Sequence, residues 1–70
     1  MLSFHIHEQF GCLQIDLDAE GMGVLMGALA ALVGERSSHR HLRSPNDLDA
    51  TTPWGEKAFL QVIINYTEGD

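Results

Sequence analysis

The stretch from Gly21 to Gly34, GMGVLMGALAALVG, contains no charged or hydrogen-bonding side chain. Large apolar side chains recur in it at helical spacing, and Asp18 precedes it where an N-cap residue belongs. The pattern predicts a helix over about 19–33, ended by Gly34. Because a helix that is apolar all round has to be covered on more than one side, this segment limits the folds open to the chain.

A chain of 70 residues is one domain that buries only about 60% of its unfolded surface, so we expect a thin core and a need for further stabilisation. Cys12 is the only cysteine, which excludes an internal disulfide. We therefore expect a homodimer. One stripe of the helix is bulky (Met22, Leu25, Leu29, Leu32), and another consists of small residues. The expected dimer interface combines small residues of the helix with two apolar side chains of the last strand: Gly23, Gly27, Ala30, Ala31, Phe59 and Ile63.

Alternating apolar and polar residues predict two strands before the helix, over 2–7 and 12–17, joined as a hairpin with Gly11 in the connection. After the helix, residues 38–43 are typical of an edge strand, and residues 57–66, apolar on both faces, of a central one. The sequence thus predicts an α+β domain over 1–70 in the order β-β-α-β-β. Its four-stranded, mostly antiparallel sheet would carry one helix on one face.

The formal net charge of −6 disfavours nucleic-acid binding, since phosphate backbones are repelled, and favours a basic protein partner. No basic leader precedes an apolar run, and the most apolar stretch is shorter than a membrane span needs. We therefore expect a cytoplasmic protein that does not bind membranes.

The segment over 44–56 is long for a connection within a small domain, and such connections tend to be functional or disordered. It holds Trp54 among three carboxylates, which is typical of a binding site for a basic partner. The expected partner-binding residues are Trp54, Asp47, Asp49 and Glu56. The alternative is that Trp54 folds back to fill one end of the core.

Two His-x-His pairs, His5/His7 and His39/His41, raise the alternative of a metal-binding module. Residues i and i+2 of a strand share a face, so two adjacent strands, or two strands meeting across a dimer, could offer four imidazoles to one zinc ion. We interpret Cys12 as a small packing residue, because a strand lacks the helix N-terminus that activates a thiol. A small hydrolase that uses Cys12 with a histidine is a further alternative. Because the thiol lacks this activation, we expect a non-enzyme.

Three segments, LQIDLDAEGMGVLMGALAAL, HRHL and LQVIINY, succeed one another across a polar loop. This succession, from about residue 12 to 66, resembles the small immunity proteins of bacterial polymorphic toxin systems, in particular the immunity protein thirty-two type. The resemblance implies a cytoplasmic non-enzyme that binds and blocks a cognate toxin. An uncharacterised small structural domain is the remaining alternative.

Overall fold

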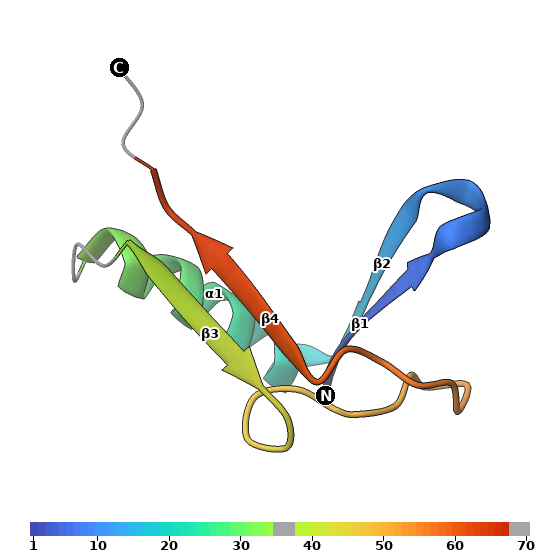
Figure 1. The fold of residues 1–70 in the computed structure, drawn as a ribbon. Helices are drawn as coiled ribbons and strands as arrows, with labels where there is room; N and C mark the ends of the chain where they lie inside the picture. The colour runs from blue at the N-terminus through green and yellow to red at the C-terminus, as the bar shows by residue number, and fades with distance from the viewer. Residues whose placement is uncertain (35–37, 68–70) are drawn as a thin grey trace.

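The computed structural model of the protein describes residues 1–34 and 38–67 (Figure 1). Two strands precede one helix and two strands follow it, which confirms the predicted α+β class and element order. The elements are β1 (Leu2–His7), the 3-10 turn η1 (Glu8–Phe10), β2 (Cys12–Leu17), α1 (Ala19–Gly34), β3 (His39–Arg43) and β4 (Gln61–Asn65).

The first hairpin forms as the alternation predicts. β1 and β2 pair antiparallel from Leu2 opposite Leu17 to His7 opposite Cys12. Gly11 has a φ of 60°, which glycine adopts without steric cost, and its N–H bonds the carbonyl of Glu8 to close the turn. This register places apolar side chains on one face of the hairpin and the histidines on the other.

The helix begins at the expected cap. The carboxylate of Asp18 accepts a hydrogen bond from the N–H of Gly21 at 2.9 Å and another from the amino group of Met1. These two contacts, the amino group first, hold the pKa of Asp18 below its usual range. Local cap chemistry therefore fixes where α1 starts.

The expected single four-stranded sheet is wrong. The strands form two separate two-stranded antiparallel sheets, β1–β2 and β3–β4. The edge of β1 that β4 would need is taken partly by the connection over 44–60: Asp49 donates its N–H to the carbonyl of Leu2, and Phe59 donates to Phe4. Beyond Phe59 the two hairpins diverge (Figure 1), so β4 pairs with β3 alone and is not the expected central strand.

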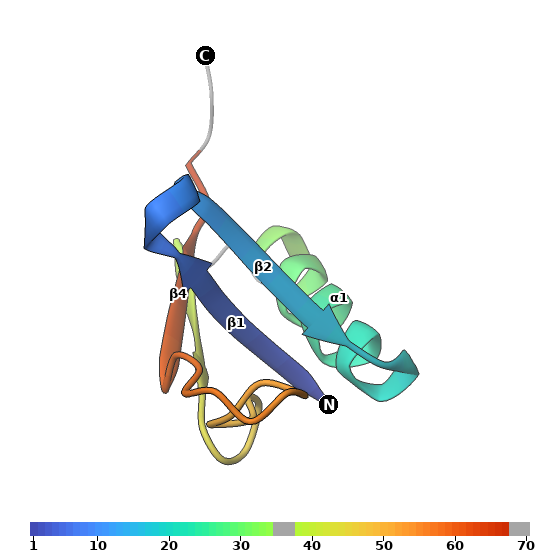
Figure 2. The ribbon, with the colours of Figure 1, turned by 90° about the vertical axis from the view of Figure 1, so that its right-hand side faces the viewer.

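The core lies where α1 crosses the bases of both hairpins. Figure 2 shows α1 beside β2, with β3 and β4 on the other side of β1. Val24, Leu25 and the inward side chains of β4 pack around this core. Its buried members come from four parts of the chain: Leu2, Phe4, Ala28, Leu42 and Leu48. Leu48 belongs to the connection between β3 and β4, so part of that connection is core.

The glycines of α1 differ in how closely another segment of backbone approaches them. A Cβ placed on Gly21 would lie 1.7 Å from the carbonyl oxygen of Met1, whereas Gly23, Gly27 and Gly34 have open space at that position. The start of β1 therefore lies against the first turn of α1, and in the described ranges 1–34 and 38–67 no other segment comes within 4 Å of a Cβ placed at Gly23, Gly27 or Gly34.

Candidate protein-binding surface at the Trp54 loop

The connection between β3 and β4 is ordered by its own hydrogen bonds. Thr52 is buried and donates its N–H to the carbonyl of Glu56 at 2.7 Å, while its hydroxyl accepts the N–H of Glu56 at 3.0 Å. Thr51 and Lys57 pair as an isolated antiparallel bridge. Gly55, at a φ of 90°, makes the tight turn that this closure requires. Trp54 is thus held near the apex of a narrow, closed loop.

Trp54 lies on the surface and not in the core. Trp54 is 45% exposed, whereas Leu48 of the same connection belongs to the buried core. The ring of His5 meets the indole edge to face, with centroids 5.6 Å apart. A half-exposed aromatic supported from below by another ring is pre-organised to bind.

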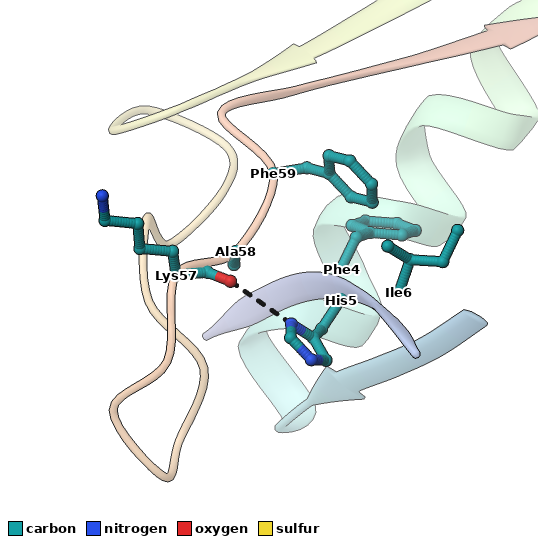
Figure 3. A pocket seen from close by; sticks show the side chains of 6 residues that line it. All are labelled: Phe4, His5, Ile6, Lys57, Ala58 and Phe59. Atoms are coloured by element: carbon teal, nitrogen blue, oxygen red, sulfur yellow. Dashed lines mark hydrogen bonds between the residues drawn. The ribbon is translucent and has the colours of Figure 1, made fainter. Parts of the chain in front are cut away.

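His5 ties this loop to β1. Its Nε2 lies 3.2 Å from Oε2 of Glu56, and its Nδ1 lies 3.2 Å from the carbonyl oxygen of Lys57, a contact visible in Figure 3. His5 occupies the opposite face of β1 from Phe4 and Ile6 (Figure 3). The polar face of the first hairpin and the Trp54 loop therefore form one surface.

The polar contacts continue across the first hairpin. The rings of His5 and His7 pack edge to face at 4.8 Å, and Nε2 of His7 bonds Oε1 of Gln14 at 2.8 Å. The amide nitrogen of Gln14 then donates to both carboxylate oxygens of Asp16, at 3.1 and 3.2 Å. The sequence did not identify Gln14, although its position opposite His5 follows from the hairpin register.

The Trp54 loop surface, which we define as Trp54, Glu56, His5, His7 and Gln14, thus combines half of the expected partner-binding set with half of the expected metal set. The pocket that His5 lines together with Phe4 and Phe59 measures about 180 Å³ (Figure 3), below the few hundred Å³ typical of small-molecule sites.

Asp47 and Asp49 lie elsewhere in the connection. Asp47 closes the turn after β3, where its carboxylate accepts the N–H of Arg43 at 3.1 Å. Both aspartates line a hollow with Met1 and Glu20 beside the start of α1. Of the four residues expected to bind a partner, Asp47 and Asp49 therefore lie at this hollow, whereas Trp54 and Glu56 lie in the closed loop.

The four-histidine site does not form within one chain, because the two pairs lie on different hairpins. His39 and His41 pack edge to face at 5.0 Å on β3, and Nδ1 of His41 lies 3.1 Å from Oε1 of Gln61. Across residues 1–34 and 38–67, no three His, Cys, Asp or Glu side chains are placed to share a metal ion.

Cys12 is exposed on β2, so its interpretation as a packing residue is wrong. The side chains expected at a dimer interface are uncovered to different degrees: Phe59, Ile63 and Ala30 are exposed and Ala31 is partly buried. Within the described part of the chain, no helix combines the length and the apolarity needed to cross a membrane.

Comparison of the chain with protein-family models, with curated proteins and with solved structures finds no match.

Proposed function

We propose that this chain acts by binding another protein through the Trp54 loop surface, as a small immunity-like inhibitor of a basic toxin and not as an enzyme. The observation that carries the proposal is Trp54 itself, half exposed near the apex of a loop closed by hydrogen bonds. Tryptophan is among the side chains most enriched at the energetic centres of protein interfaces, and a rigid loop avoids much of the ordering cost of binding.

The charges beside Trp54 support a basic partner. Glu56 presents a carboxylate whose side chain is 59% exposed, and Asp16 ends the polar network across the hairpin. Lys57 is the one cation adjacent to Glu56 in sequence, on a chain of net charge −6. Such a field attracts a cationic protein and raises its association rate at low ionic strength. The proposal places the chain in the cytoplasm, where such an inhibitor would act.

Binding is tested with the product of the neighbouring gene. That protein is purified and titrated calorimetrically with the wild-type chain, with Trp54→Ala and with Tyr66→Ala, at about 50 and 300 mM salt. Tyr66 is the matched control because it is an aromatic side chain of similar exposure, 41%, beyond the end of β4. In parallel, both variants are expressed in cells that produce the neighbouring protein, and growth is followed.

We expect the wild-type chain and Tyr66→Ala to bind and to protect growth, with weaker binding at the higher salt concentration. Trp54→Ala should lose about thirtyfold in affinity, the size of a hot-spot residue. Equal binding by Trp54→Ala and the wild type would assign the contact to another surface. A neighbouring protein that is neither toxic nor bound would refute the immunity-like function.

A further inference from the structure

The first hairpin carries an apolar face that its own chain covers only at the base. Leu2 and Phe4 are buried there under α1. Ile15, which pairs with Phe4, shares that face with the pair Ile6 and Leu13 nearer the tip, yet all three are exposed. Because β1–β2 diverges from the rest of the fold (Figure 1), no element of the described chain covers them.

The helix has an uncovered apolar flank of its own. Gly27 and Ala31 line a groove of about 490 Å³ against β3. At 100° per residue, Leu29 and Val33 point roughly opposite to Ala31, away from β3. We define the open apolar face as these hairpin and helix side chains together, each 43 to 63% exposed: Ile6, Leu13, Ile15, Met22, Leu29 and Val33.

We propose that the open apolar face binds a second copy of this chain. In a two-fold dimer the hairpin tip of each copy lies against the helix flank of the other. The face is self-complementary for this purpose, because it consists of a β-hairpin surface and a helix flank. These are the two kinds of element that already pack together in the core, where Leu2 and Phe4 meet Ala28. A two-fold axis brings the same patch of each copy together, so one patch supplies both sides of the interface.

The exposed area matches what a dimer needs. A specific interface buries at least about 1,200 Å² in total, or roughly 600 Å² per copy, which requires about 100 Å² from each of the six side chains of the face. The whole chain exposes 5119 Å², whereas a compact monomer of its mass, 7.7 kDa, exposes about 4,300 Å². The difference is about 800 Å².

Charge favours a second copy over a basic partner at this face. None of its six side chains is charged, so the face offers a cationic protein no ionic contact. The carboxylates near α1 and in the connection, such as Asp18, Asp47 and Glu56, lie outside the face. Two copies can therefore join their apolar faces although each carries a net charge of −6.

The oligomeric state tests this proposal, which is independent of the Trp54 loop surface. Sedimentation equilibrium from about 1 to 100 µM compares the wild type with Leu13→Glu, Val33→Glu and Ile63→Glu. All three side chains are exposed within one chain, so each variant can fold, and circular dichroism checks that it does. Ile63 is the matched control because it lies on the face of β4 opposite to Val62 and Ile64, which pack on the core.

We expect the wild type and Ile63→Glu to sediment at twice the chain mass of 7.7 kDa. Leu13→Glu and Val33→Glu should each weaken dimerisation by about a hundredfold or more, since each copy would place a buried, unpaired carboxylate in the interface. A wild-type monomer at the highest concentration overturns the proposal. A dimer that survives both face variants, or that only Ile63→Glu disrupts, overturns it as well.

Discussion

At the scale of single residues, the connection between β3 and β4 shows how two large side chains a few positions apart take opposite roles. Leu48 is buried in the core against Leu2 and Phe4, and Trp54 is half exposed beside His5. Both are large and apolar, and both stand in a polar segment. The hydrogen bond from Asp49 to Leu2 holds Leu48 inward, and the closed loop around Thr52 holds Trp54 outward.

This difference predicts unequal costs of truncation. Leu48→Ala should destabilise the fold by about 2 to 5 kcal/mol, because it removes a fully buried aliphatic group and leaves a cavity. Trp54→Ala should cost less than about 1 kcal/mol, because the indole lies outside the core. Urea unfolding of both variants measures the two values. A loss for Trp54→Ala as large as that for Leu48→Ala would show that Trp54 belongs to the core after all.

At the scale of elements, α1 is a helix with one covered and one uncovered side. Ala28 and Leu32 are buried, whereas the bulky stripe expected from the sequence is divided: Leu25 packs against the core and Met22 and Leu29 are exposed. Helical periodicity shows which residues share a face. Whether another element covers that face depends on where the two hairpins lie.

Two glycines of α1 should respond oppositely to the same substitution. Gly27→Ala should stabilise the chain by about 1 kcal/mol, because alanine favours the helix and the site has open space. Gly21→Ala should destabilise it by about 1 to 3 kcal/mol, because the added methyl group meets the backbone carbonyl of Met1. Thermal unfolding measures both changes. If Gly27→Ala instead dissociates a dimer, the small-residue stripe is the interface that the sequence suggested.

β4 shows why its place in the sheet could not be predicted. Its apolar side chains on both faces are typical of a central strand, and Val62 and Ile64 do pack on the core. Yet Ile63 is exposed and β4 pairs only with β3. Apolar side chains on both faces of a strand indicate that both faces have to be covered. The covering element can come from the same chain or from another one.

At the scale of the whole molecule, two hairpins share one small core and diverge from it (Figure 1). The connection over 44–60 takes part of the β1 edge that would have joined the two sheets. The result is a chain with a larger surface than its mass requires. Association through the open apolar face would remove that surplus without changing the fold of either copy.

A dimer of this kind predicts a thermal midpoint that depends on concentration. Mass action stabilises the associated state as concentration rises, so a tenfold increase should raise the midpoint by about 5 °C. Differential scanning calorimetry over a range of protein concentrations measures this shift. Leu13→Glu should unfold at a midpoint that does not change with concentration, and a constant midpoint for the wild type would contradict the dimer.

The sequence by itself determined the local elements. Alternation and Gly11 specify the first hairpin, Asp18 specifies the start of the helix, and the order β-β-α-β-β follows. Only the tertiary structure decided that the sheet divides in two, that Leu48 and not Trp54 enters the core, and that His5 meets the Trp54 loop. The physical reason is the distance along the sequence over which each interaction acts. Caps, turns and alternation act over a few residues, whereas these outcomes depend on which distant segment pairs with the edge of β1.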